Sequence, residues 1–130
     1  MTATEPEPIR IGTLTASSLV RVPADATLRE VAEVIDEDDV GAVIVGVESV
    51  DGIVSERDVV RAVAAHLDPS TATALSVATT EVVRVDAGAP IDDVAASMME
   101  HYVRHLLVEE DGAVIGVVSA RDLLGALVAR

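Results

Sequence analysis

Gly52-Ile53-Val54-Ser55-Glu56-Arg57-Asp58 occurs a second time in this chain, as Gly116-Val117-Val118-Ser119-Ala120-Arg121-Asp122, 64 residues later. Two stretches upstream of these segments also repeat, at an offset of 63: Leu19 to Val22 with Val82 to Val85, and Val40 to Val45 with Val103 to Val108. The offset changes from 63 to 64 between Val45 and Gly52, where a hairpin turn can accommodate a difference of one residue. A tandem repeat of this length predicts a duplicated folding unit that packs against its copy.

Both copies predict the same order of elements, β-α-β-β-α. The first predicts a strand at Leu19 to Val22, a helix capped by Thr27 and reaching about Asp38, a buried strand at Ala42 to Val47, a strand at Ile53 and Val54, and a helix from Ser55 to about His66. The second predicts a strand at Val82 to Val85, a helix from Pro90, strands at His105 to Val108 and Val114 to Val118, and a helix from Ser119. The predicted fold class is α/β, an α+β sandwich of two repeats with pseudo-twofold symmetry.

The predicted boundaries follow from these elements. Residues 1–8 are polar and rich in Pro, which predicts a flexible tail. The first repeat is expected to span residues 9–66 and the second residues 75–130, with a linker at 67–74.

Composition narrows the functional classes. Half of the 130 residues are hydrophobic, almost all of them aliphatic, and Tyr102 is the only aromatic residue. The absence of Cys excludes disulfides, thiol catalysis and Cys-based zinc sites. The apolar runs are too short to span a bilayer and no signal peptide is recognisable, so we expect a cytoplasmic protein.

The charge is strongly negative. The chain has 23 acidic residues, nine Arg and no Lys, for a formal net charge of −14. Such a surface should repel nucleic acid and anionic membranes. It becomes tolerable in molar salt, where the Debye length falls to about 3 Å. The composition therefore suggests a halophilic archaeon as the source, although a GC-rich genome is an alternative explanation for the missing Lys.

The repeated segment places a potential anion site at each predicted helix start. Unpaired backbone N–H groups and the positive end of the helix dipole favour phosphate there. The guanidinium groups of Arg57 and Arg121 could form bidentate hydrogen bonds with phosphate oxygens. A carboxylate one turn into the helix could accept two hydroxyl groups of a cis-diol. The alternative is structural, because Ser-x-x-Asp is also close to a capping box, in which the two side chains satisfy the helix's own amides.

The repeated segments at 52–58 and 116–122 resemble the signature of the CBS domain, a module that occurs in tandem pairs called Bateman modules. The resemblance covers essentially everything after residue 8, and Val103 to Val108 is similar to the family's middle strand. It implies a regulatory module that binds AMP, ADP, ATP or S-adenosylmethionine in clefts between the repeats. The ligand-binding residues that the resemblance implies are Ser55, Arg57, Asp58, Thr79, Ser119, Arg121 and Asp122. Arg104 and His105 are added as candidate ligand-binding residues of the cleft and its rim.

The resemblance also implies roles for these residues. The Asp of each signature would bind the ribose hydroxyls, and the Ser three residues earlier would meet phosphate. Ile44 and Leu107 stand where the family's middle strand often has Pro, and Thr15-Ala16 and Ala78-Thr79 stand where many members have Met-Thr. A module that binds proteins and no nucleotide is therefore the alternative function.

Other candidate sites are weaker. His101 and His105 could share a metal, but no third ligand is obvious, and a strand-edge or cleft-rim role is simpler. The acidic run from Asp36 to Asp39 is more simply a solvated helix end than a cation site. No catalytic motif is present, so we expect no enzyme activity and no required cofactor. We expect a stand-alone pair that forms a homodimer and signals to a protein partner, and the apolar helix from Leu123 to Val128 suits an interface.

Overall fold

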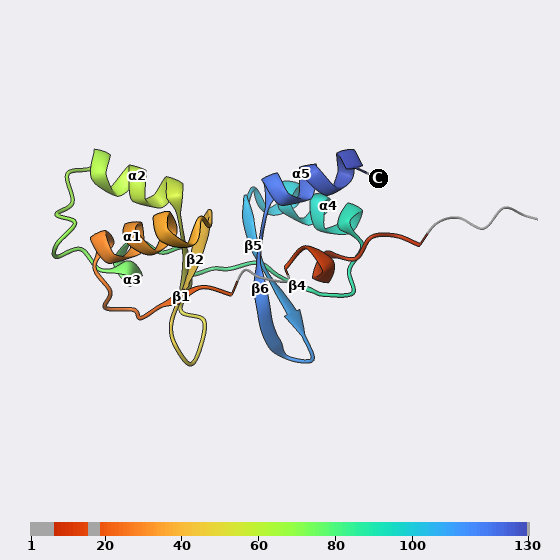
Figure 1. Ribbon diagram of the computed structural model, residues 1–130, viewed down its shortest axis with the longest axis horizontal. Coiled ribbons are helices and arrows are strands. Elements are labelled where there is room, and N and C mark those ends of the chain that lie inside the picture. The colour runs from red at the N-terminus through yellow and green to blue at the C-terminus, as the bar shows by residue number, and fades with distance from the viewer. Residues whose placement is uncertain (1–6, 16–18, 130) are drawn as a thin grey trace, which may run out of the picture. The chain divides into compact units, whose positions relative to one another are not determined.

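The computed structural model describes residues 7–15 and 19–129, and its contacts divide the chain into two compact units. We call residues Ser17–Val82 the middle unit, and Met1–Ala16 together with Val83–Arg130 the terminal unit. Figure 1 shows the chain coloured from its start to its end, with the elements of each unit labelled. The units do not coincide with the predicted repeats, because the segment before residue 16 contacts the second repeat. The predicted boundaries 9–66 and 75–130 describe the sequence repeat and stay predictions.

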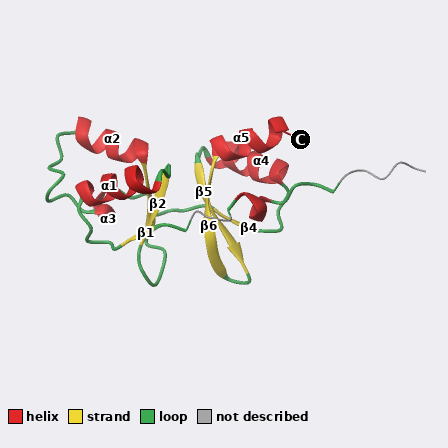
Figure 2. Ribbon diagram, viewed as in Figure 1, coloured by secondary structure: helices red, strands yellow, loops and turns green. Residues whose placement is uncertain are grey.

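The middle unit contains one mixed three-stranded sheet. Its elements are β1 (Arg21–Val22), α1 (Leu28–Asp38), β2 (Ala42–Val45), β3 (Gly52–Ser55), α2 (Glu56–Ala64) and α3 (Ala74–Val77). The strand order is β1-β2-β3, with β1 parallel and β3 antiparallel to β2. Figure 2 shows α1 and α2 together beside this sheet.

The terminal unit repeats this architecture. Its elements are the 3-10 helix η1 (Ile11–Leu14), β4 (Arg84–Asp86), α4 (Ile91–His101), β5 (His105–Glu110), β6 (Ala113–Ser119) and α5 (Ala120–Ala129). The strand order is β4-β5-β6, again with one parallel and one antiparallel pair. The predicted β-α-β-β-α order is therefore confirmed in both copies. Among the described residues, no helix is long and apolar enough to cross a membrane.

Local sequence signals explain where α1 begins and ends. The Thr27 side chain accepts a hydrogen bond from the backbone N–H of Glu30, and the Glu30 carboxylate accepts one from the N–H of Thr27. This reciprocal capping box satisfies two of the amides that a helix start leaves unpaired. The helix ends at Asp39, which adopts the left-handed conformation with φ of 51°. The predicted cap at Thr27 is confirmed.

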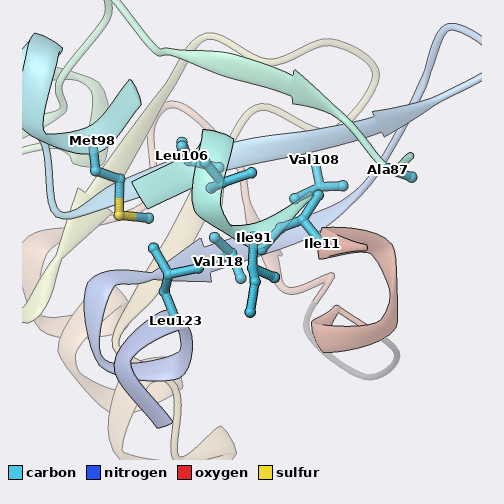
Figure 3. Close-up of a cluster of buried hydrophobic side chains, with 9 residues drawn as sticks. Ile11, Ala87, Ile91, Met98, Leu106, Val108, Val118 and Leu123 are labelled. Carbon is cyan, nitrogen blue, oxygen red and sulfur yellow. The ribbon is translucent and has the colours of Figure 1, made fainter. Parts of the chain in front are cut away.

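Each unit has its own aliphatic core. The core of the terminal unit combines α4, α5, β5 and β6 with Ile11 from the amino-terminal segment, which is completely buried (Figure 3). The hydrophobic cluster of the middle unit consists of buried Val and Ala residues, and it includes Ala74 of α3, which aligns with Ile11 at the offset of 63. Each cluster thus includes one buried residue, Ile11 or Ala74, from a segment that lies outside its β-α-β-β-α repeat.

Backbone hydrogen bonds tie these segments into their units in the same way. In the terminal unit, Ile91 N–H at the start of α4 donates to the carbonyl of Ile9, and Ile11 N–H donates to the carbonyl of Ala89. In the middle unit, Leu28 N–H at the start of α1 donates to the carbonyl of Ala72, and Ala74 N–H donates to the carbonyl of Ala26. The first helix of each repeat is therefore capped by the segment that precedes the other repeat.

The differences from the predicted elements are local. The short helix η1 falls at the start of the predicted first repeat, and α3 falls at the start of the predicted second repeat, with only Ala74 in the predicted linker. Strands β1 and β4 begin two residues later than predicted, at Arg21 and Arg84. Pro90 is the N-cap of α4, so Ile91 is the first helical residue. Most of the predicted tail lies outside the described residues, and Glu7 and Pro8 are exposed.

Candidate functional site

The middle unit places the repeated Ser and Asp at the junction of β3 and α2. Ser55 is the N-cap of α2, and its hydroxyl accepts a hydrogen bond from Asp58 N–H at 3.2 Å. The Asp58 Oδ2 atom accepts hydrogen bonds from the N–H of Ser55 at 2.9 Å and from its hydroxyl at 3.0 Å. Both side chains are half-buried, so the junction is both ordered and accessible.

Thr79 lies beside the same strand. Its N–H donates to the Ile53 carbonyl at 2.9 Å, and the N–H of Ile53 donates to the carbonyl of Thr79 at the same distance. The approach is so close that a Cβ atom on Gly52 would lie 2.7 Å from the Thr79 carbonyl oxygen. Glycine is therefore required at the start of the repeated segment because it lets the Thr79 segment reach the strand. Ser55, Asp58 and Thr79 are thus brought together in one unit.

Small residues complete the surroundings of the middle junction. Ala42 of β2 is the register partner of Ser55, and the carbonyl of Gly41 accepts a hydrogen bond from Glu56 N–H at 3.0 Å. Neither residue was among the predicted site residues. The signal that could have found them is the offset of 63, which aligns them with Arg104 and His105.

The terminal unit builds the same junction between β6 and α5. Asp122 N–H donates to the Ser119 hydroxyl at 3.0 Å, and Ser119 N–H donates to the carboxylate of Asp122 at 3.1 Å. His105 is the register partner of Ser119, and the carbonyl of Arg104 accepts a hydrogen bond from Ala120 N–H at 2.7 Å. The structure therefore brings four predicted site residues together around the start of α5.

The arginines near these junctions are exposed. Arg57, Arg104 and Arg121 form no side-chain hydrogen bond or ion pair with the described residues. Among the described residues, the one ion pair joins the Arg84 guanidinium to the Glu109 carboxylate at 2.6 Å. Three guanidinium groups thus remain in solvent on a strongly acidic chain, where they could meet an anion.

The capping alternative is realised in both copies. One carboxylate oxygen of each Asp accepts the reciprocal cap bond, as an ordinary capping box requires. The Oδ1 atom of Asp58 accepts no hydrogen bond from the described residues, and a carboxylate oxygen has more than one acceptor position. The cap therefore orients Asp58 and leaves it capacity to accept hydroxyl groups of a ligand.

The two histidines considered as a metal pair occupy different elements. The His101 Nδ1 atom lies 2.9 Å from the carbonyl oxygen of Ser97 at the end of α4, while His105 begins β5. Within the described ranges, no three His, Asp or Glu side chains are grouped so that they could hold a metal ion. The acidic run from Asp36 to Asp39 is exposed at the end of α1.

Comparisons with known proteins agree on one family. The model of the CBS domain matches residues 11–65 and 74–129. Hypoxic response protein 1 of Mycobacterium tuberculosis is 37% identical over 100 residues, which are 75% of this chain and 70% of that protein. A crystal structure of Hypoxic Response Protein I with two coordinated zinc ions has a TM-score of 0.71 at 30% identity and covers 91% of this chain and 98% of its own.

A second solved structure is a CBS domain protein from Pyrobaculum aerophilum complexed with AMP. It is 32% identical to this chain, with a TM-score of 0.78, and the match covers 94% of this chain and all of that one. The similarity therefore extends over both repeats.

Proposed function

The chain belongs to the CBS-domain family, and from this premise we propose that it is a regulatory module that binds an adenosine-containing ligand and passes the signal to a protein partner. AMP is the ligand we favour, with ADP, ATP and S-adenosylmethionine as related candidates. The observation that carries the proposal is the repeated Ser-x-x-Asp junction, which fixes a carboxylate at a helix start in both units, with an exposed Arg as the preceding residue. The AMP complex of the similar Pyrobaculum protein supports this choice of ligand.

The proposed contacts follow from the chemistry of each group. Asp58 and Asp122 accept hydrogen bonds from the two ribose hydroxyls, since a carboxylate has two oxygens that can meet a cis-diol. Ser55 and Ser119 place phosphate near the first amides of α2 and α5, where the helix dipole favours negative charge. Arg57, Arg104 and Arg121 neutralise phosphate oxygens, His105 lies on the same rim, and Thr79 contributes a hydroxyl in the middle unit.

Signalling follows from linkage. A ligand shifts the module toward the arrangement that it binds more tightly, by no more than the difference between its affinities for the two arrangements. A partner that contacts only one arrangement then senses the ligand. We propose that the module is non-catalytic, acts in the cytoplasm and works as a homodimer.

The first test is thermal unfolding in molar salt with AMP, ADP, ATP and S-adenosylmethionine in turn. A ligand at 100 times its dissociation constant should add about 2.7 kcal/mol of stability, a shift of several degrees. Zinc chloride belongs in the same series because Hypoxic Response Protein I is solved with zinc. No shift with any nucleotide or with S-adenosylmethionine would favour the alternative of a module that binds only proteins.

Substitutions locate the site once a ligand is found. Asp58→Ala and Asp122→Ala should each weaken binding at their own site about 10- to 100-fold, because a charge-assisted hydrogen bond contributes about 1.5–3 kcal/mol. Isothermal titration calorimetry gives the affinity and the number of sites. Asp51→Ala is a matched control, because Asp51 is an exposed acid outside both junctions. Unchanged affinity in both junction variants would refute the site.

A further inference from the structure

The first residue of the helix that follows the repeated Ser differs in charge between the two junctions. It is Glu56 in α2 and Ala120 in α5, which the offset of 64 aligns. Glu56 is exposed, and its carboxylate forms no ion pair or hydrogen bond with the described residues. Ala120 packs against the core of the terminal unit and is partly buried. An unpaired carboxylate therefore stands at one of two helix starts that are otherwise repeated.

The backbone of the two junctions gives no reason for a different ligand. The N–H of Glu56 donates to the Gly41 carbonyl at 3.0 Å, and the N–H of Ala120 donates to the Arg104 carbonyl at 2.7 Å. The amide two residues later donates to the hydroxyl of the capping Ser in both copies. The same two amides are thus occupied in α2 and in α5. A preference for the charge of a ligand has to come from the side chains.

Asp39 adds a further carboxylate to the middle junction. It is exposed and stands two residues before Gly41, so the Cα atoms of these two residues lie within about 8 Å of each other. The carbonyl of Gly41 is the one that accepts the hydrogen bond from Glu56 N–H. The offset of 63 aligns Asp39 with the uncharged Tyr102, and Gly41 with Arg104. The middle junction thus has an acid where the terminal junction has none, and lacks a cation that the terminal junction has.

The net charges of the two junctions have opposite signs. Three acids and one Arg give the middle junction a formal charge of −2, and two Arg and one acid give the terminal junction a charge of +1, with His105 counted as neutral. These residues are Asp39, Glu56, Arg57 and Asp58 in the middle junction and Arg104, Arg121 and Asp122 in the terminal junction. The local potential of a site favours ligands of the opposite charge.

We propose that Glu56 makes the two copies selective for ligands of opposite charge. The terminal junction takes a phosphorylated adenosine such as AMP, and the middle junction takes an adenosine with a positively charged 5′ substituent, such as the sulfonium of S-adenosylmethionine. The inference rests on the proposed function, in which the 5′ substituent lies beside the first residues of α2 or α5. A phosphate at the start of α2 is repelled by the carboxylates of Glu56 and Asp39, whereas a sulfonium is attracted by them. Such a repulsive group discriminates between ligands that share the same nucleoside.

An acid in the first turn also stabilises a helix, and this is the structural alternative for Glu56. Asp58 already supplies a carboxylate to the same turn of α2. A purely structural role would change the stability of the helix and would affect the binding of all ligands alike. Two ligands that share adenosine and differ in the charge of the 5′ substituent therefore separate the two roles.

Calorimetric titrations of single-site variants provide the test. In Asp122→Ala, which retains the middle site, the additional change Glu56→Gln should strengthen AMP binding about 5-fold or more and weaken S-adenosylmethionine binding by a similar factor. Glu48→Gln is the matched control, because it removes the same charge from an exposed residue in the turn at the other end of β2, and it should change neither affinity. In Asp58→Ala, which retains the terminal site, Ala120→Glu should weaken AMP binding by a similar factor. Circular dichroism confirms that each variant is folded.

The salt dependence gives a second readout of the same charges. Lowering the salt from about 1 M to the lowest concentration at which the protein stays folded should strengthen AMP binding at the terminal site and weaken it at the middle site, because screening acts on attraction and repulsion alike. Equal effects of Glu56→Gln on both ligands, or tighter AMP binding at the middle site of the parent, would overturn the inference and leave the proposed function standing. If neither ligand binds the parent, both fail together.

Discussion

The two junctions share their caps and differ in what surrounds them. In the middle unit, Gly41 and Ala42 lie beside the start of α2, and Thr79 lies against β3. In the terminal unit, Arg104 and His105 occupy the positions beside the start of α5. Ala16 aligns with Thr79 at the offset of 63 and lies outside the described residues. Duplication has thus kept the Ser, Arg and Asp of each junction and changed the residues beside it.

This difference teaches that a repeated motif does not make two equal sites. Arg104 adds a second cation to the terminal junction, whereas the middle junction has Arg57 alone. We therefore expect the terminal site to gain more from each additional phosphate charge. The middle site, with a hydroxyl and small neighbours, should depend more on the nucleoside.

The largest expected difference between the two units is in their stability at low salt. Residues 17–82 have 13 acidic and four basic residues, a formal charge of −9, while the rest of the chain has ten acidic and five basic residues, a charge of −5. Lowering the salt from molar to about 0.1 M lengthens the Debye length from about 3 to 10 Å. The middle unit should then lose its structure first, because it repels itself more. Hydrogen exchange should show unprotected β2 amides while β5 is still protected.

That experiment also tests the halophilic origin, which stays a prediction. If circular dichroism is unchanged over the whole range of salt, the acidic surface does not need screening. If β5 loses protection before β2, the unequal charge of the units does not decide the order.

Truncating Ile11 should show how much the terminal unit depends on its amino-terminal segment. Ile11 is completely buried in that core, so Ile11→Ala should lower the free energy of unfolding by about 2–5 kcal/mol. Leu75→Ala is the matched control in the corresponding segment of the middle unit, since Leu75 is 42% exposed and Ile11 is completely buried. Urea denaturation measures both. Equal, small effects would mean that the segment adds little to the core.

Exchanging the residues beside the caps should exchange ligand preference. Arg104→Ala should weaken binding of ATP at the terminal site about tenfold or more and affect AMP less, because a lost charge-assisted hydrogen bond contributes about 1.5–3 kcal/mol. Gly41→Arg should strengthen ATP binding at the middle site. Calorimetry at two salt concentrations separates these effects from general screening. An equal loss for AMP and ATP in Arg104→Ala would contradict the assignment of this arginine to additional phosphates.

The smallest expected effect is that of the Thr79 hydroxyl. Thr79 pairs with Ile53 through its backbone, so Thr79→Ala should keep the strand contact and lose one neutral hydrogen bond to the ligand. Binding at the middle site should weaken about 2- to 10-fold, since such a bond contributes about 0.5–1.5 kcal/mol. Thr80→Ala is the control, because Thr80 is the neighbouring exposed threonine. Equal affinities of the two variants would remove Thr79 from the site.

The sequence was sufficient to predict the elements whose signals are local. Thr27, Ser55 and Ser119 were recognised as helix starts because capping residues act on amides within the next turn. Helix α3 has four residues, too few for a hydrophobic period to show. The pairing of Ile9 with Ile91 joins residues that are distant in sequence, and no local pattern announces such a contact.

The candidate site also contains residues that the sequence predicted and residues that it did not. Ser55, Asp58 and Thr79 were predicted from the repeated segments and the family resemblance, and the structure brings them together. Gly41 and Ala42 have no functional group that draws attention, so only their alignment with Arg104 and His105 at the offset of 63 could indicate them, and the strand register places them beside Ser55. The ligand-binding roles of all these residues stay predictions.

The first helix of each repeat is capped by the segment that precedes the other repeat, and this arrangement has a consequence for synthesis on the ribosome. The middle unit is continuous in sequence, so all its residues have been made once residue 82 is added. The terminal unit begins with the first residues of the chain but needs residues 87–91, with which Ile9, Ile11 and Gly12 form hydrogen bonds. During translation the middle unit can therefore fold while the amino-terminal segment waits for its partner. A pause in translation between residues 82 and 91 would lengthen the time in which Ile11 is exposed to chaperones and proteases.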